Sequence, residues 1–171
     1  MNLITRSNGY TILSGVTYVN TGALPISVAD TQTWAKVSGQ ADEIEDLIKE
    51  IVDVAENEFN FTIINKTVTA VYSDYGRYVR LPFAPIIEVV SAEVDGEAVE
   101  YSIIGDTLVF ETFGGVLEVE YKTGGTLPEG VKLAVKKAVL SAFEDRQDTV
   151  LGGVGLIPNH SRAIFKRYTN Y

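Results

Sequence analysis

The chain has 171 residues, 46% of them hydrophobic, and a formal net charge of −9. This length and composition indicate one folded domain with a real core and exclude a disordered chain. The acidic balance argues against a protein that grips nucleic acid through its phosphates, and the absence of cysteine excludes disulfides, a thiolate nucleophile and a Cys-ligated metal.

Residues 1–24 are polar, contain glycine and favour β-structure. A segment without its own core is usually ordered by a neighbour, so we expect an N-terminal arm or hairpin outside the main fold. No long apolar run follows Arg6, which argues against a signal peptide, and no stretch approaches the roughly 18 apolar residues of a membrane span. We therefore expect a protein that is made in the cytoplasm and does not associate with a membrane.

Two helices are predicted next. Ser27 is a plausible N-cap with Asp30 as its partner, and Gly39 ends this first helix. Asp42 caps a second helix, whose apolar residues recur at three- and four-residue steps: Ile44, Leu47, Ile48, Ile51, Val54, Ala55 and Phe59. The acidic residues lie largely off that stripe and form either a solvated face or an acidic wall lining a lumen: Glu43, Asp46, Glu50, Asp53 and Glu56.

The middle of the chain, residues 61–122, is predicted to be a small antiparallel β-meander. Residues 61–72 are β-branched and alternate, which indicates a strand. Pro82 and Pro85 bracket a stiff extended loop, and residues 86–94 form a strand that ends at Asp95-Gly96, a strong hairpin signal. Further Gly-containing turns separate short strands up to Tyr121.

A long helix follows at residues 126–146. Thr126 and Glu129 have the form of a capping box, and Pro128 suits the first turn. Its broad apolar face consists of Val131, Ala134, Val135, Ala138, Val139, Ala142 and Phe143. Since this face and the stripe on the helix at 42–59 have no other extensive partner, we expect the two helices to pack together as the core.

Residues 149–171 form a C-terminal tail: a Gly-rich loop, then a short helix capped by Asn159. Apolar residues on a flexible loop are costly to expose, and the basic cluster is unusual on an acidic chain, so we expect an interface with a partner protein or another subunit at Leu151, Val154, Leu156, Ile157, Arg162, Phe165, Lys166, Arg167 and Tyr168. Deleting the tail should then hardly change melting. The alternative is that the loop folds back over its own subunit.

No catalytic, cofactor-binding or metal site is predicted. His160 is the only histidine and starts the terminal helix, where a surface or capping role is the plain interpretation. The run Gly152-Gly153-Val154-Gly155 has no Lys-Ser/Thr after it, so it is not a phosphate loop. The acids of residues 42–56 lack the spacing of a calcium loop. A small hydrolase built on His160 is a rival hypothesis that loss of activity on His160→Ala would support.

Two segments in a fixed order carry a family resemblance. They are L-P-F-A-P-I-I-E-V-V-S-A-E-V-D-G at residues 81–96 and P-E-G-V-K-L-A-V-K-K-A-V-L-S-A-F-E-D-R at residues 128–146. With residues 55–61 before them and 164–168 after them, their order over residues 25–168 resembles the small head-tail connector (head completion) proteins of tailed bacteriophages. The matching positions include Leu81, Pro82, Pro85, Ile86, Val89, Val135, Lys136, Ala138, Glu144, Arg146, Ile164, Phe165, Arg167 and Tyr168.

The resemblance implies an α+β fold: a small helical bundle with an inserted antiparallel β-meander. The connector core would span residues 25–148, with the arm at 1–24 and the tail at 149–171. Such proteins form oligomeric rings, commonly dodecameric, that dock to the portal vertex, extend the DNA channel and offer a platform for the tail. The expected partners are therefore the portal protein, tail or further adaptor proteins, and other copies of the chain.

The resemblance also places the protein in the virion, at the head-tail junction, where duplex DNA would pass without specific binding. An acidic lumen suits this task because it repels the DNA backbone. The alternative function is a monomeric β-rich binding module for a surface or carbohydrate ligand, which exposed tyrosines would favour.

Overall fold

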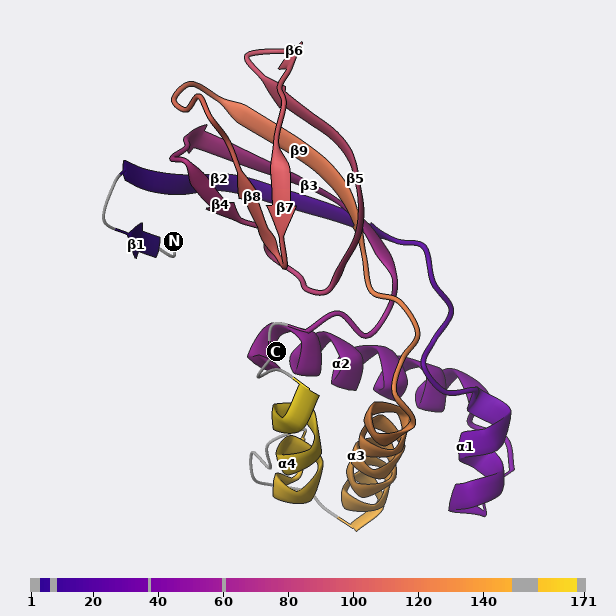
Figure 1. Ribbon diagram of the computed structural model, residues 1–171. Coiled ribbons are helices and arrows are strands. Elements are labelled where there is room, and N and C mark those ends of the chain that lie inside the picture. The colour runs from indigo at the N-terminus through magenta and orange to yellow at the C-terminus, as the bar shows by residue number, and fades with distance from the viewer. Residues whose placement is uncertain (1–3, 7–8, 37, 60, 149–156, 169–171) are drawn as a thin grey trace. The chain divides into compact units, whose positions relative to one another are not determined.

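The computed structural model describes residues 4–6, 9–36, 38–59, 61–148 and 157–168 (Figure 1). The chain divides into two compact units. One, here called the β unit, is Met1–Gly22 with Asn65–Gly125; the other, the helical unit, is Ala23–Ile64 with Thr126–Tyr171. The α+β class predicted from the sequence is confirmed.

The β unit consists of two antiparallel sheets. The larger sheet has the order β1-β2-β3-β9-β5-β6 and the smaller sheet the order β4-β8-β7. The strands are β1 (Ile4–Arg6), β2 (Gly9–Asn20), β3 (Lys66–Asp74), β4 (Tyr78–Arg80), β5 (Ile86–Val94), β6 (Glu97–Ala98), β7 (Ser102–Ile104), β8 (Thr107–Val109) and β9 (Leu117–Thr123).

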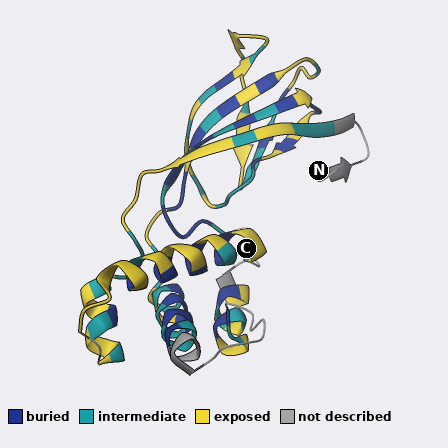
Figure 2. Cartoon of the chain, turned by 180° about the vertical axis from the view of Figure 1, so that it is seen from behind, coloured by how far each residue is buried: buried dark blue, intermediate teal, exposed yellow. Residues whose placement is uncertain are grey.

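Both sheets contribute to one apolar core in the β unit. Alternate residues of β3 and β9 are buried, as expected for strands with one face on a core (Figure 2). The core residues are Val68, Ala70, Tyr72, Tyr75, Val79, Leu81, Ala92, Leu108, Phe110, Leu117, Val119 and Tyr121.

The helical unit has its own core. It contains α1 (Val28–Ala35), α2 (Ala41–Phe59), α3 (Glu129–Asp148) and α4 (Asn159–Tyr168). The predicted apolar faces of α2 and α3 do pack together, with Ile44, Leu47, Ile48 and Ile51 in the same cluster as Val131, Val135, Ala138 and Val139. Within the described residues, no helix is both long and apolar enough to span a membrane.

Residues 9–20 differ from the expected arm. They form β2, which pairs with β3 from Ile12↔Asp74 to Asn20↔Lys66 and is therefore part of the larger sheet. The strand needs no neighbouring molecule for order, because Leu13 and Val16 pack against the core of the β unit.

The predicted strand at residues 61–72 also begins later than expected, at Lys66. Ile63 and Ile64 instead belong to the core of the helical unit. Smaller shifts occur at helix ends: α1 ends at Ala35 with Lys36 as a left-handed C-cap, and α3 begins at Glu129 rather than near Thr126.

Candidate assembly surfaces

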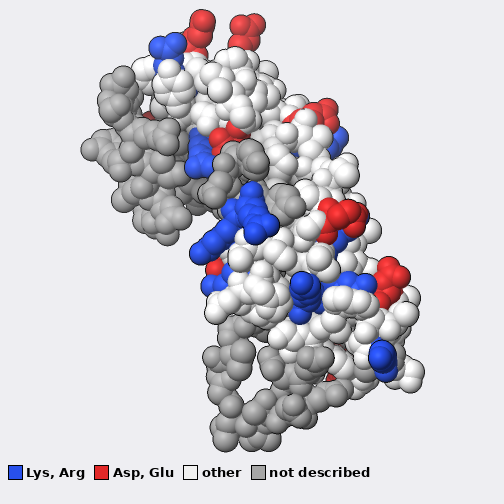
Figure 3. Space-filling view, turned by 60° about the horizontal axis from the view of Figure 1, so that its bottom comes forward, with Lys and Arg blue, Asp and Glu red and all other residues white. Residues whose placement is uncertain are grey.

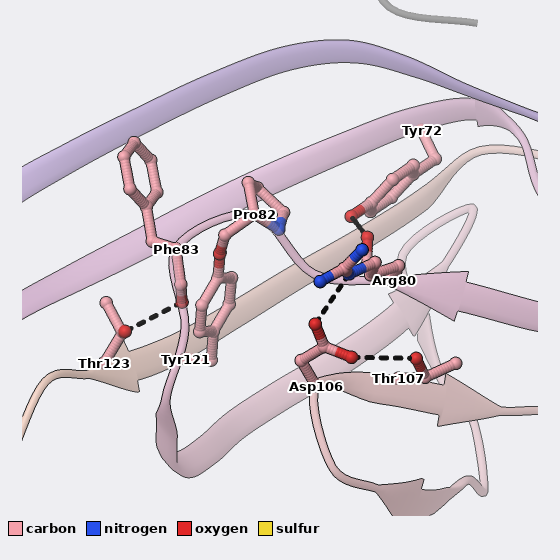
Figure 4. Close-up of polar contacts among 8 residues, drawn as sticks. All are labelled: Tyr72, Arg80, Pro82, Phe83, Asp106, Thr107, Tyr121 and Thr123. Atoms are coloured by element: carbon pink, nitrogen blue, oxygen red, sulfur yellow. Dashed lines mark hydrogen bonds and ion pairs between the residues drawn. The ribbon is translucent and has the colours of Figure 1, made fainter. Parts of the chain in front are cut away.

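The loop that carries the L-P-F-A-P motif is held by the end of β9 (Figure 4). The Tyr121 hydroxyl donates to the Pro82 carbonyl oxygen, and Thr123 Oγ1 lies 2.8 Å from the carbonyl oxygens of both Phe83 and Pro85. The Gly124 N–H donates to the Pro85 carbonyl oxygen at 3.0 Å. The motif therefore encodes a fixed loop, because its carbonyl groups are satisfied from a neighbouring strand.

Phe83 in this loop also connects to β2. Its ring meets the Tyr18 ring edge to face, with centroids 5.4 Å apart. Lys66, only 2% exposed, places its Nζ 4.3 Å from the Tyr18 ring centroid and 5.3 Å from that of Phe83. Aromatic faces stabilise a cation in this way, so the three residues join β2, β3 and the loop.

The second sheet is tied to the first by a small polar group (Figure 4). Arg80 Nε lies 2.6 Å from Asp106 Oδ2, and the Thr107 hydroxyl donates to Asp106 Oδ1 at 3.1 Å. The Tyr72 hydroxyl donates to the Arg80 carbonyl oxygen at 3.1 Å. Burial raises the pKa of the Tyr72 and Tyr121 phenols, so both stay protonated in the folded protein at neutral pH.

Asn65 forms hydrogen bonds to the two chain segments that follow β2 and β9 at one end of the larger sheet. Its carbonyl oxygen accepts from the Thr21 and Gly22 N–H groups at 2.8 and 3.0 Å, and its Oδ1 accepts from the Gly125 N–H at 2.8 Å. A Cβ on Gly124 would lie 2.2 Å from Asn65 Oδ1, so that position requires glycine. These bonds fix the ends of β2, β3 and β9 next to one another.

The larger sheet has two open edges within the described residues. On β2, β1 pairs only with Gly9–Thr11, and on β5, β6 pairs only with Glu93 and Val94. Exposed strand edges offer unpaired N–H and C=O groups to another chain. Exposed apolar side chains occur along both: Tyr18 and Val19 on β2, Ile87 and Val90 on β5.

The charged residues of the helical unit are distributed unevenly among its helices. The exposed side of α2 carries Asp42, Glu43, Asp46, Glu50 and Asp53, with Lys49 bonded to Glu45 at 2.7 Å. Helix α4 has three basic residues and no acidic one, whereas α1 has no Lys or Arg and α3 has both charges in equal number. Lys136 lies 4.6 Å from the ring of Trp34, which is 44% exposed. Figure 3 shows Lys and Arg beside Asp and Glu on one face of the molecule. The acidic α2 and the basic α4 therefore differ in charge.

Glu56 is not part of the acidic face, contrary to the sequence analysis. It is 3% exposed, and its Oε1 accepts from the N–H groups of Ile63 and Ile64 at 2.7 and 2.9 Å. This carboxylate therefore holds the segment that follows α2 against the end of the helix. The sequence offers one signal for its burial, since Glu56 directly follows Ala55 and precedes Phe59 by three positions, both on the apolar stripe.

Three of the predicted interface residues in the tail make contacts inside the helical unit. Ile157 and Phe165 are each 2% exposed, and the Phe165 ring stacks on Phe59 with centroids 5.3 Å apart. Arg162 pairs with Glu58 at 2.6 Å. For these residues the tail folds back on its own unit, which favours the alternative of the sequence analysis, and deleting the tail is therefore expected to lower the melting temperature.

The other predicted tail residues lie on the last turn of α4 or outside the described residues. Lys166 and Arg167 are exposed on the last turn of α4. Leu151, Val154 and Leu156 lie outside the described residues, as does the side chain of Tyr168. The described part of the chain holds no group of three His, Asp or Glu side chains placed to bind a metal, and His160 is exposed in the first turn of α4.

Comparison with known proteins supplies the fold relationship. The sequence matches no protein-family model and no curated protein. A chain from the neck of an empty gene transfer agent (GTA) particle, computed with C6 symmetry, matches with a TM-score of 0.70 at 14% identity, covering 91% of this chain and 96% of that chain. This chain has the fold of a particle-neck protein.

Two more structures agree with this neck fold. A chain of the native GTA virion gives a TM-score of 0.68 at 16% identity, and one from the native GTA neck, computed with C12 symmetry, gives 0.66 at 15% identity. Both cover 91% of this chain and 96% of the matched chain. At the level of fold, the resemblance to head-tail connector proteins is confirmed.

Proposed function

We propose that the protein is a structural subunit of a ring in the neck of a phage-like particle, between the portal vertex and the tail. The observation that carries the proposal is the fold match, which spans nearly the whole of both chains. The ring would be a dodecamer, would extend the DNA channel and would offer a surface to the tail or a further adaptor.

The differences between the surfaces of the subunit support ring formation. Head-to-tail rings need two different faces on each subunit. The larger sheet has different strands at its two edges, and the helical unit has an acidic α2 and a basic α4. Both features suit a contact between unlike surfaces of neighbouring copies.

The acidic balance supports a channel through which DNA moves. A net charge of −9 disfavours stable contact with phosphates, because such contact depends on clustered Lys and Arg. The acidic residues of α2 are the candidates for a lumen wall. They would repel the DNA backbone without reading its sequence.

We propose that the portal contact lies in the C-terminal tail. Arg167 is exposed at the end of α4 and could meet acidic groups of a neighbour, and Lys166 on the same turn adds to the basic charge there. Leu151, Val154, Leu156 and Tyr168 complete the proposed contact, whereas Ile157, Arg162 and Phe165 would hold α4 in place.

Co-sedimentation with the purified portal tests the function. The wild-type chain should sediment with the portal assembly at a fixed ratio, and Arg167→Glu should reduce that ratio without lowering the melting temperature. A wild-type chain that stays in the supernatant at micromolar concentration would count against a neck subunit.

The monomeric binding module receives less support. Tyr72, Tyr75 and Tyr121 are buried in the β unit and only Tyr18 and Tyr78 are among its strongly exposed tyrosines in the described structure. A scattered pair of tyrosines does not form a stacking platform for a sugar.

A further inference from the structure

The uncovered parts of the two edge strands, β2 and β5, lie at the same end of the larger sheet. Following the register across the sheet, Asn20 aligns with Lys66, Thr123 and Ile86, and Thr17 aligns with Thr69, Glu120 and Ser91. The strands that cover the edges, β1 and β6, occupy the other end. The uncovered part of β5, Ile86–Ser91, therefore spans the same rows as Thr17–Asn20 of β2.

The edge on β2 lacks the usual protection, whereas the uncovered part of β5 carries one charged residue, Glu88, which is paired with Lys122 of β9. Natural edges are blunted by charges, by proline or by bulges that point polar groups outward. Residues 9–20 contain no charged side chain. The edge strand β5 does have two register irregularities, which leave Ile87 and Val90 without an opposite residue on β9.

The two bulged residues of β5 are apolar and exposed. Ile87 is 53% and Val90 48% exposed. A bulge changes the direction of a side chain. At both bulges of β5 the side chain exposed to water is apolar, although a polar side chain would be hydrated at a lower free-energy cost. This arrangement is typical of an edge that is covered in the assembled state.

The strand order determines how a second copy would fit. The strands β2, β3, β9 and β5 are each antiparallel to their neighbour, so β2 and β5 run in opposite directions. When a second copy of the sheet is placed beside the first in the same orientation, β2 of the second copy lies antiparallel to β5 of the first. In the three-stranded sheet β4 and β7 run in the same direction, so the same repeat would give the weaker parallel pairing.

We infer that β2 of one copy pairs antiparallel with the Ile86–Ser91 edge of β5 in the next copy, so that the larger sheets continue from subunit to subunit. This inference rests on the proposed ring and names the partner of each edge, which is a second copy of this chain. The contact is head-to-tail, so it continues from copy to copy instead of stopping at a dimer, and the portal would set the rotation that closes it into a ring.

Cysteine cross-linking on the portal tests the contact. Because the chain has no cysteine, Thr17→Cys and Val90→Cys report without background. The double variant, bound to the portal and treated with a short bifunctional thiol reagent, should give a ladder of cross-linked oligomers. Glu118→Cys replaces Val90→Cys in the control, since Glu118 is exposed on the interior strand β9 of the same sheet.

The single variants separate the two modes of association. Thr17→Cys and Val90→Cys alone should not cross-link, but an equal mixture should give dimers between unlike chains. Cross-linked dimers from either variant alone would indicate symmetric edge pairing and overturn the inference. Charge at the edge gives a second test: Val90→Lys should reduce assembly at least tenfold, whereas Ile103→Lys, equally exposed on β7, should not.

Failure of the contact and failure of the function look different. A double variant that sediments with the portal but gives no ladder overturns the edge pairing and leaves the neck function standing. A chain that never joins the portal, in wild-type or variant form, overturns both.

Discussion

At the scale of single residues, the carboxylate of Glu56 holds the segment between α2 and β3 by accepting from the Ile63 and Ile64 N–H groups. Glu56→Ala would leave two buried N–H groups without this acceptor and should lower the free energy of unfolding by about 2 kcal/mol or more. Glu56→Gln keeps an acceptor oxygen and should lose less. Urea unfolding followed by circular dichroism measures the difference, and equal stability of Glu56→Ala and wild type would refute this role.

The buried phenols predict how stability changes at alkaline pH. Burial raises the folded-state pKa of Tyr72 and Tyr121 above the unfolded value of about 10. Above pH about 10 the unfolded chain therefore loses protons that the folded chain keeps, and the free energy of unfolding falls as pH rises further. Below that pH these two groups contribute no slope.

Urea titrations at a series of pH values across this range check the slope. Tyr72→Phe removes one of the two groups and should make the decline above pH about 10 less steep. Tyrosinate absorbance that reaches its full amplitude before unfolding would show that Tyr72 and Tyr121 are accessible, contrary to this account.

Single residues also show how far a sequence can be interpreted. Ser27 was predicted as an N-cap, and its side chain does accept from the Asp30 N–H. Such a cap is a local interaction that a short motif specifies. The roles of Asn65 and Glu56 were not predicted. Asn65 bonds to Gly125, which only the tertiary structure brings near, and Glu56 bonds to Ile63 across a turn that has no recognisable sequence motif.

At the scale of elements, the α2–α3 contact is the centre of the helical unit. Val139 is fully buried there, so Val139→Asp would bury a charge and should cost at least about 3 kcal/mol. Leu133→Asp on the same helix is the matched control, because Leu133 is 41% exposed. A Val139→Asp protein that melts cooperatively at the wild-type temperature would contradict the packing.

Helix α4 contributes to the same core. Phe165→Ala removes the ring that stacks on Phe59 and should lower the free energy of unfolding by about 3 kcal/mol. Arg167→Ala, on the exposed side of α4, should stay within about 0.5 kcal/mol of wild type. Calorimetry measures the melting temperatures of the two variants. Equal melting temperatures for Phe165→Ala and Arg167→Ala would mean that α4 contributes little to the core.

Element types were easier to predict than their partners. The periodic stripes of α2 and α3 and the Asp95-Gly96 hairpin follow from local sequence, and β5 has the predicted bounds of Ile86–Val94. The role of residues 9–20 was not predictable in the same way. Their partner, β3, is separated from them by two helices, and long-range pairing leaves no local signal.

At the scale of the whole molecule, the charge balance makes a prediction about DNA. The protein should give no gel shift with duplex DNA at low-micromolar concentration and physiological salt, because its acidic surface cannot replace the counterions of the phosphates. A portal-bound assembly should behave in the same way. A salt-sensitive complex with duplex DNA would contradict a channel through which DNA moves freely.

The central claim concerns assembly, and electron microscopy of the chain mixed with its portal tests it most directly. Negative-stain averages should show an additional ring on one end of the portal, coaxial with its channel and with matching rotational symmetry. Portal particles with no added density, together with a chain that remains monomeric at the same concentration, would contradict the account.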